Sequence, residues 1–238
     1  MKLIVGAVIA TAAVIILGVL IIIPSFFETE STNVMLTITV YDQPNLATWC
    51  QNLSEFLEFE NGHGAIFISG EVAQKNPSCV TSFSKNFDIG SQTFSYVSLP
   101  QISDYRAQLE EVKKGKDAID KVGNLDSRLF KAPFSDTDEN IYSLLSNNEI
   151  LADFSYQNQY NKFFNGKFLK FDLLTINSKD ISAKSLQSIK SSKIPVQIEF
   201  DSSMTLDEIK NVFSQIKSSN IDFVTASDIA QMELTGRN

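Results

Sequence analysis

Histidine is almost absent from this sequence, because His63 is the only one among 238 residues. Any hydrolytic or metal site that needs two imidazoles is therefore excluded. His63 stands between two glycines at a predicted helix-to-strand turn, and no metal-ligand spacing surrounds it. We expect it to be a surface turn residue rather than a ligand.

Basic charge is also in deficit. The chain has 20 Lys and Arg against 28 Asp and Glu, which gives a net charge of −8. A nucleic-acid surface needs clustered Lys and Arg, so no nucleic-acid partner is expected. Without its apolar N-terminal run the chain keeps about 210 residues, enough for one domain with a full core, including a single barrel.

Charge is absent from the N-terminal run between Leu3 and Pro24, which is long enough to cross a membrane as a helix. We expect residues 1–27 to be a retained membrane anchor. The alternative is a signal peptide, which would be shorter and end in a small-residue cleavage site. Lys2 before the run, with Glu28 and Glu30 after it, predicts a single-pass protein whose C-terminal domain is extracytoplasmic.

Residues 28–33 form a polar tether, and residues 34–238 are predicted to form one domain. Leu36, Ile38 and Val40 alternate with threonines, which is typical of a strand. Strands and helices then alternate along the chain, so the sheet should be mostly parallel. The predicted helices cover residues 46–60, 71–85, 104–122, 136–147, 182–190 and 205–218, with a break at Pro77 in the second and a further short helix that ends at Met232. The predicted strands cover 35–40, 65–70, 87–92, 129–131, 150–154, 168–176, 196–200 and 222–225.

Several segments resemble the motifs of the polysaccharide deacetylases (the NodB-homology family). Residues 39–44 read Thr-Val-Tyr-Asp-Gln-Pro, similar to the family's Thr-Phe-Asp-Asp-Gly-Pro, and residues 64–70 resemble its second strand. Residues 87–96 resemble its metal-binding segment, residues 130–134 its Phe-Arg-x-Pro-Tyr-Gly motif, and residues 223–225 its closing strand. The resemblance implies an α/β fold, a distorted (β/α) barrel of seven or eight mostly parallel strands, with the cleft at their C-terminal ends.

Most of the family's catalytic positions carry other residues here. Tyr41 stands where the resemblance places the general base, and Asp42 matches a metal ligand. Gln92 and Tyr96 match the two metal-binding histidines, and Lys131 matches the arginine that orients the base. The segment that ends at Asp201 holds no counterpart of the late catalytic histidine.

This set of residues predicts loss of the family's chemistry. The family uses a divalent metal such as zinc, and a hydrolytic zinc ion needs about three protein ligands, of which only Asp42 is retained. We therefore expect no metal cofactor and a non-catalytic domain that binds a cell-envelope glycan or envelope protein. One alternative is an amide hydrolase with an altered mechanism that uses Asp42, Asp153 or Asp201 as base. Another is a structural subunit that docks through the acidic helix at residues 104–121.

The candidate ligand-binding residues come from these positions and from one polar loop. Asp42 could instead cap the helix that begins near Asn45, and Trp49 is expected in the core. A glycan platform is predicted in the loop at residues 157–162 and its flanks. The candidates are Asp42, Gln92, Tyr96, Lys131, Tyr156 and Tyr160.

Cys50 and Cys79 are the only cysteines. An even count in an extracytoplasmic protein favours a disulfide, and the two residues fall on neighbouring predicted helices. Sequence spacing does not fix whether their Cα atoms approach within about 7 Å, so a bridge and two free thiols both remain open.

Overall fold

A computed structural model describes residues 31–83, 85–138, 140–155, 161–164, 168–171, 173–217 and 220–235. Its strands form one sheet in the order β7-β6-β5-β4-β3-β2-β1-β9-β8, and β10 also pairs with β1. The strands are β1 (Thr32–Val40), β2 (Gly64–Ile68), β3 (Phe87–Ser91), β4 (Leu129–Phe130), β5 (Ala152–Asp153), β6 (Asn161–Phe164), β7 (Phe168–Phe171), β8 (Leu174–Asn177), β9 (Val196–Asp201) and β10 (Ile221–Phe223).

Seven strands, from β8 through β1 to β5, pair in parallel, while β6 and β7 add an antiparallel edge. The result is a parallel α/β half-barrel, so the predicted fold class is confirmed at this level. Within the described residues no pairing joins β7 to β8, and the ring stays open.

Strand β1 lies two strands from the β8 edge of the sheet and pairs with three others. Strand β9 pairs along Val34–Thr39, whereas β10 pairs with its first residues and β2 with its last. Alternate residues of β1 point to opposite faces of the sheet, and both faces are buried. Val34, Leu36, Ile38 and Val40 face the outer helices, and Met35 faces the barrel interior.

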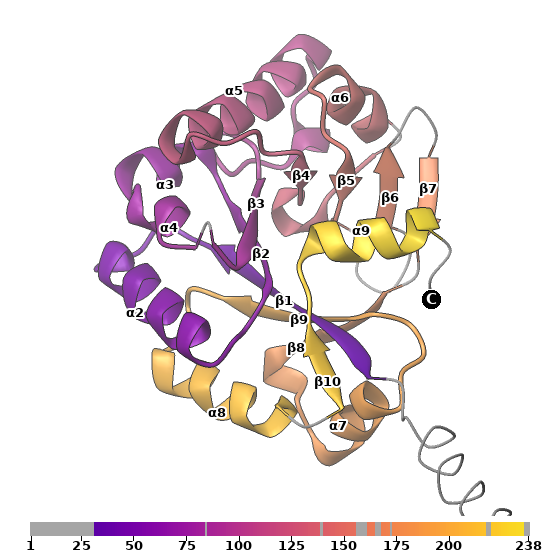
Figure 1. Cartoon of the computed structure of the whole chain (residues 1–238). Helices are drawn as coiled ribbons and strands as arrows, with labels where there is room; N and C mark the ends of the chain where they lie inside the picture. Colours follow the sequence, from indigo (N-terminus) through magenta and orange to yellow (C-terminus); the bar gives the residue numbers. More distant parts are fainter. Residues whose placement is uncertain are drawn as a thin grey trace, which may run out of the picture. The chain divides into compact units, whose positions relative to one another are not determined.

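Helices cover the outside of the half-barrel (Figure 1). Interior residues Met35 and Phe67 pack against Ala226 and Ile229 of α9, which covers the inner apolar layer. The helices are α2 (Leu46–Phe59), α3 (Gly70–Lys75), α4 (Ser78–Thr81), α5 (Tyr105–Gly123), α6 (Ile141–Asn147), α7 (Ala183–Lys190), α8 (Leu206–Ile216) and α9 (Ala226–Thr235), with 3-10 turns η1 (Leu99–Gln101), η2 (Pro133–Ser135) and η3 (Ser178–Asp180).

Several predicted boundaries differ from the structure. The break predicted at Pro77 is confirmed, because residues 71–85 hold two helices, α3 and α4, but the second of them ends at Thr81. The strand predicted over 168–176 is two strands, β7 and β8, which pair with different partners. Helix α6 begins at Ile141 rather than at 136, because Asp136 accepts a hydrogen bond from Ser98 instead of capping a helix.

The predicted membrane anchor lies outside the described residues, as does most of the tether. Strand β1 begins at Thr32 and so includes the last two residues of that tether. Among the helices that the structure describes, none has the length and apolarity to cross a bilayer.

A disulfide joins Cys50 of α2 to Cys79 of α4, with Cα atoms 5.0 Å apart. Both residues are fully buried in the core beneath these helices. The bridge therefore ties α4 to α2. Trp49 packs against the same core, and its indole N–H donates to the Met204 carbonyl at 2.9 Å.

Candidate functional site

A cleft of about 410 Å³ opens at the C-terminal ends of strands β1, β3, β4 and β9. This is the end at which parallel α/β barrels place their binding sites. Five of the positions singled out in the sequence line it together: Tyr41, Gln92, Tyr96, Lys131 and Asp201. The other lining residues are Thr39, Ala132, Phe134, Ser135, Asn177, Glu199 and Phe200.

A buried ion pair lies among the cleft's lining residues. Lys131 Nζ is 2.6 Å from Glu199 Oε1, and the two side chains are only 8% and 7% exposed. Thr39 Oγ1 lies 3.5 Å from the ammonium, and the Gln197 amide donates to Glu199 at 3.2 Å. Strands β4, β1 and β9 supply these groups, because alternate residues of each strand face the interior.

Gln92 immediately follows β3 and also lines the cleft. Its side chain is 1% exposed, and its Oε1 atom has no hydrogen-bond partner in the described structure. Gln92 and Lys131 lie one residue beyond the paired residues Ser91 and Phe130, so they are neighbours across the two strand ends.

Aromatic rings form one wall of the cleft. The ring centroids of Tyr41 and Tyr96 are 5.4 Å apart, and those of Tyr96 and Phe134 are 5.1 Å apart. Phe134 is 70% exposed, so one large apolar face is presented to solvent. Burial, together with the hydrogen bond to Tyr41, raises the pKa of Tyr96 well above its ordinary value, so its phenol stays neutral.

Two strained loops hold these rings. Tyr96 and Phe134 have φ values of 56° and 59°, in the left-handed region that non-glycine residues rarely adopt. Glu111 of α5 anchors the first loop by accepting from the backbone N–H groups of Phe94 and Ser95, at 3.2 and 3.0 Å. Ser98 donates to Asp136 and so joins the two loops.

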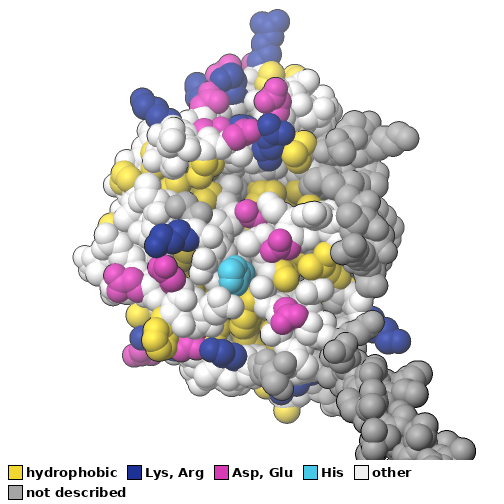
Figure 2. All heavy atoms as spheres, in the orientation of Figure 1, with side chains coloured by type: hydrophobic (Ala, Val, Ile, Leu, Met, Phe, Trp, Pro, Cys, Tyr) yellow, Lys and Arg dark blue, Asp and Glu magenta, His cyan; other side chains and the backbone are white. Residues whose placement is uncertain are grey.

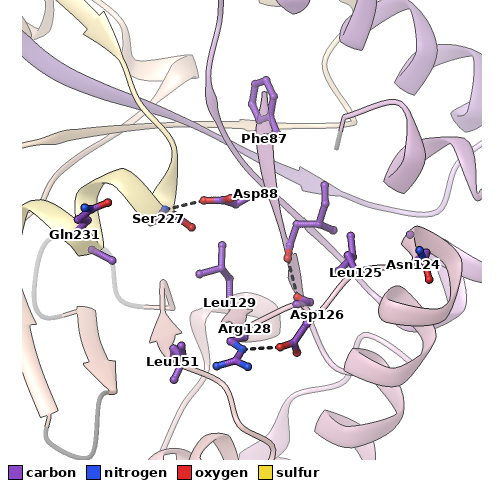
Figure 3. A pocket seen from close by; sticks show the side chains of 14 residues that line it. Phe87, Asp88, Asn124, Leu125, Asp126, Arg128, Leu129, Leu151, Ser227 and Gln231 are labelled. Atoms are coloured by element: carbon purple, nitrogen blue, oxygen red, sulfur yellow. Dashed lines mark hydrogen bonds and ion pairs between the residues drawn. The ribbon is translucent and has the colours of Figure 1, made fainter. Parts of the chain in front are cut away.

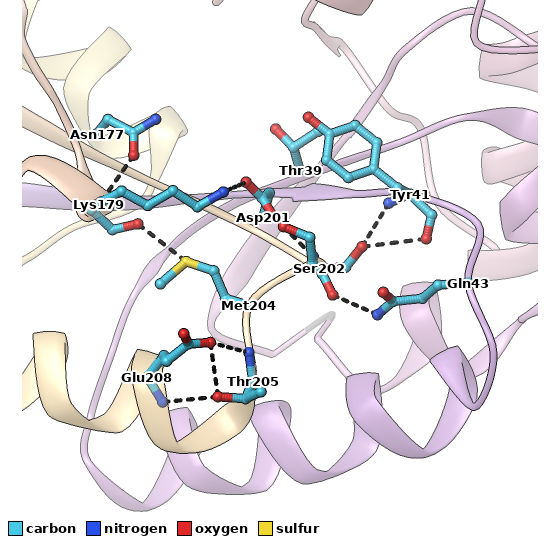
Figure 4. A network of polar contacts seen from close by, with 12 residues as sticks. Thr39, Tyr41, Gln43, Asn177, Lys179, Asp201, Ser202, Met204, Thr205 and Glu208 are labelled. Atoms are coloured by element: carbon cyan, nitrogen blue, oxygen red, sulfur yellow. Dashed lines mark hydrogen bonds and ion pairs between the residues drawn. The ribbon is translucent and has the colours of Figure 1, made fainter.

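Asp201, at the end of β9, belongs to a polar network that reaches β1 (Figure 4). Partial burial disfavours its charged form, but hydrogen bonds from Ser203 and the Lys179 ammonium at 3.0 Å outweigh that effect, so the pKa of Asp201 is lowered. The next residue, Ser202, exchanges hydrogen bonds with the backbone N–H and carbonyl of Tyr41. This contact fixes the end of β1 against β9.

Two of the predicted carboxylates lie outside the cleft lining. Asp42 is exposed and forms an ion pair with Lys75 of α3 at 3.3 Å. It does not cap α2, whose first turn has no side-chain cap. Asp153 is fully buried, and its Oδ1 accepts from the backbone N–H of Ser155 at 2.9 Å. Of the three candidate bases, the structure therefore brings only Asp201 to the cleft.

The sequence reasoning missed Glu199, the partner of Lys131, and Phe134 as part of the wall. Glu199 could have been found from the alternation of β9, in which Gln197, Glu199 and Asp201 occupy every second position. Phe134 lies in the motif at residues 130–134, but its exposure depends on its left-handed backbone conformation within η2. Tyr156 and Tyr160 lie outside the described residues.

The remaining acidic groups and His63 form no evident metal centre. In the part of the chain described by the structure, no group of three or more His, Cys, Asp or Glu side chains is placed to hold an ion. The imidazole Nε2 of His63 lies 3.4 Å from the side-chain oxygen of Asn61. On the face seen in Figure 2, basic and acidic side chains are interspersed rather than gathered into single-sign patches.

A second cavity, of about 680 Å³, lies at the opposite end of β3 and β4 (Figure 3). None of the predicted site residues lines it. Arg128 Nε donates to Asp126 at 2.7 Å, and Asp88 accepts from the backbone N–H of Ser227 at 2.7 Å. Leu125, Leu129 and Leu151 are also part of its lining.

Comparison with known proteins points to one family. A family model described as polysaccharide deacetylase matches residues 28–152. No curated protein matches the chain.

Solved structures share the fold at low identity. Peptidoglycan deacetylase PdaC from Bacillus subtilis is 14% identical with a TM-score of 0.63, and the alignment covers 87% of this chain and 94% of that one. BA3943, a CE4 family pseudoenzyme from Bacillus anthracis, is 13% identical with a TM-score of 0.60, over 84% of this chain and 66% of that one. A family 4 carbohydrate esterase from Streptomyces lividans is 16% identical with a TM-score of 0.56, over 78% and 85%.

Proposed function

The chain belongs to the polysaccharide deacetylase family, and from this premise we propose that it is a non-catalytic member whose cleft binds a glycan. The observation that carries the proposal is the composition of the cleft. An aromatic wall of Tyr41, Tyr96 and Phe134 stands beside a polar floor in which a Lys131–Glu199 ion pair occupies the family's catalytic end.

The donor set does not fit the family's metal. Gln92 and Tyr96 replace both imidazoles, and Asp42, the one retained ligand type, pairs with Lys75 outside the cleft. Gln92 offers only an amide oxygen, a poor ligand for zinc. The Lys131 ammonium adds a positive charge that would repel a cation bound there. We therefore propose that the cleft has no catalytic metal and no metal-activated water.

The aromatic wall supports a carbohydrate ligand. Sugar rings present apolar C–H faces that pack on exposed aromatic rings, while their hydroxyls need polar partners nearby. Phe134 offers the exposed face and Tyr96 supports it edge-on. The cleft's volume of about 410 Å³ is within the usual range for a small-ligand site.

Binding is tested with the full-length protein in detergent and tetra-N-acetylchitotetraose, by isothermal titration calorimetry. Removing an aromatic contact with Tyr96→Ala or Phe134→Ala should weaken binding about 3- to 10-fold. Phe59→Ala is the matched control, because Phe59 is an 86% exposed phenylalanine on α2 outside the cleft lining. Undetectable binding by the wild-type protein to this probe and to peptidoglycan fragments would refute a glycan site.

The competing function is an amide hydrolase with an altered mechanism, which Asp201 and Glu199 in one cleft would favour. A lysine ammonium already contacts each carboxylate, at 2.6 and 3.0 Å, and would compete with a substrate proton for that oxygen. We expect no acetate release from chitin oligosaccharides. Release of acetate together with a zinc affinity tighter than micromolar would overturn the non-catalytic assignment.

The structure of a BA3943 variant with restored enzymatic activity offers a precedent for one further test. A combined Tyr41→Asp, Gln92→His and Tyr96→His variant would return the family's residue types to this cleft. Zinc binding gained by that variant, and absent from the wild type, would support loss of the metal site as the origin of this chain.

We also propose that the segment from Leu3 to Pro24 anchors the protein in a membrane, with the domain on the extracytoplasmic side. The 22 uncharged residues and the flanking Lys2 support this arrangement. The buried disulfide is in keeping with an oxidising compartment. Resistance of the full chain to alkaline extraction from membranes is the expected result, and release into the soluble fraction would contradict it.

A further inference from the structure

Gln92 has a buried side-chain amide whose oxygen forms no hydrogen bond within the described structure. It is 1% exposed, and its Oε1 has no hydrogen-bond partner among the described residues. A buried unpartnered amide oxygen is destabilising, because folding removes its water without replacing it. Such a group beside a cleft is the expected signature of a residue whose partner arrives with the ligand.

Lys131 lies next to it with donor capacity left over. A lysine ammonium has three N–H donors, and the contacts at 2.6 Å to Glu199 and 3.5 Å to Thr39 account for two of them. Gln92 and Lys131 end neighbouring parallel strands in register, so their backbones are about 5 Å apart. A hydrogen-bond acceptor and a hydrogen-bond donor therefore line the same cleft side by side.

From this pair we infer that Gln92 is the specificity-determining residue of the cleft. Its Oε1 accepts a hydrogen bond from a sugar group that in turn accepts one from Lys131 Nζ. A group that both donates and accepts is required, which a ring hydroxyl or an acetamido group satisfies and an ether or ester oxygen does not. The inference rests on the proposed glycan site and adds the chemistry by which that site selects its ligand.

The other unpartnered oxygens of the barrel provide a contrast. Thr37 Oγ1 on β1 is also buried without a partner, and Thr37 is 0% exposed, but it does not line the cleft. Removing the Thr37 hydroxyl should therefore affect stability alone. Removing the Gln92 amide should affect both stability and ligand binding, in opposite directions.

The test compares Gln92→Leu with Thr37→Val in the full-length protein. Without ligand, Gln92→Leu should raise the melting temperature by about 2–4 °C, because a buried unpartnered group is removed. Its affinity for tetra-N-acetylchitotetraose should fall about tenfold, the loss expected for one hydrogen bond. Thr37→Val should leave that affinity unchanged. Gln92→Met, which keeps an unbranched side chain, repeats the measurement in case leucine disturbs the cleft.

A second probe, cellotetraose, identifies the group that Gln92 contacts. An equal loss of affinity for both tetrasaccharides identifies a hydroxyl, and a loss confined to the acetylated one identifies the acetamido group. Unchanged affinity of Gln92→Leu and Gln92→Met, with the wild type binding normally, would overturn the inference and leave the proposed function intact. A fall in melting temperature of both variants would also overturn it, because the amide would then be satisfied within the fold. If the wild type binds neither tetrasaccharide and no peptidoglycan fragment, the proposed function and this inference are refuted together.

Discussion

Lys131 on the end of β4 and Glu199 on β9 form a buried ion pair with 2.6 Å between Nζ and Oε1. The pair joins two strands separated by 68 positions in the sequence. Replacing one partner would leave a buried, uncompensated charge, which costs far more than the pair itself contributes. The ion pair is therefore a structural constraint on the cleft as well as part of its lining.

Lys131→Met should lower the free energy of unfolding by about 3 kcal/mol, the low end of the range for breaking a buried pair, because Gln197 still donates to Glu199. Urea unfolding followed by circular dichroism measures the change. Lys75→Met is the control, since Lys75 is exposed and solvent screens its ion pairs with Asp42 and Glu71, so this variant should lose much less stability. Equal losses in the two variants would mean that the Lys131 charge is screened by solvent.

The Cys50–Cys79 disulfide closes a loop with a sequence separation of 29. Removing it with a Cys50→Ala and Cys79→Ala double substitution should lower the free energy of unfolding by about 2–4 kcal/mol, because the unfolded chain regains loop entropy. The same unfolding assay reports the loss. Protein that is denatured without reductant should show no thiol labelling, and two labelled thiols would contradict the bridge.

Glu111 positions the aromatic wall without lining the cleft. Its carboxylate accepts from the backbone of Phe94 and Ser95 and from the Ser95 hydroxyl, which holds the loop that carries Tyr96. Glu111→Ala should weaken chitin-oligosaccharide binding several-fold, with Glu111→Gln recovering part of it because an amide oxygen can still accept. Glu110→Ala is the control, since Glu110 is exposed and, among the residues that the structure describes, forms an ion pair only with Lys114, at 3.6 Å.

Gly115 of α5 approaches the same loop so closely that a Cβ atom would lie 2.5 Å from the carbonyl carbon of Thr93. Backbone rather than a flexible side chain fills that space, so Gly115→Ala should displace the loop. Weaker glycan binding and a lower melting temperature are both expected. Preserved binding would show that glycan binding does not require the loop of Tyr96 to stay in this position.

The ionised Asp201 side chain should make the free energy of unfolding decrease at acidic pH. Its pKa lies below the usual 3.8 in the folded protein because Ser203 and Lys179 favour the charged form. Its contribution is therefore complete above pH 3.8 and is lost as the pH falls through the lower folded-state value. The stability difference between wild type and Asp201→Asn should narrow below about pH 4 in unfolding experiments. A difference that stays constant down to pH 2.5 would contradict the lowered pKa.

Hydrophobic periodicity predicted the fold well where it was strong. The alternation of Leu36, Ile38 and Val40 located β1, and Pro77 marked the division between α3 and α4. The boundary between β7 and β8 could not be found in this way, because their sequence reads as one apolar strand. Their separation comes from tertiary pairing, with β7 bonded to β6 and β8 bonded to β9.

The cleft was predicted in part. Motif order placed Tyr41, Gln92, Tyr96 and Lys131 together, because they follow strands that end at the same edge of one parallel sheet. The resemblance also carried Asp42 into the site, but its side chain turns toward Lys75. Side-chain direction just beyond a strand depends on the local turn, and sequence alone does not give that turn.

The pairing of β1 has a consequence for synthesis of the chain. Its partners β9 and β10 begin at Val196 and Ile221, more than 150 residues later. While the ribosome is still translating the middle of the protein, one edge of β1 stays unpaired and able to bond to other chains. The sheet around β1 can therefore be completed only after the C-terminal segment is synthesised. A prematurely terminated chain would be prone to aggregate.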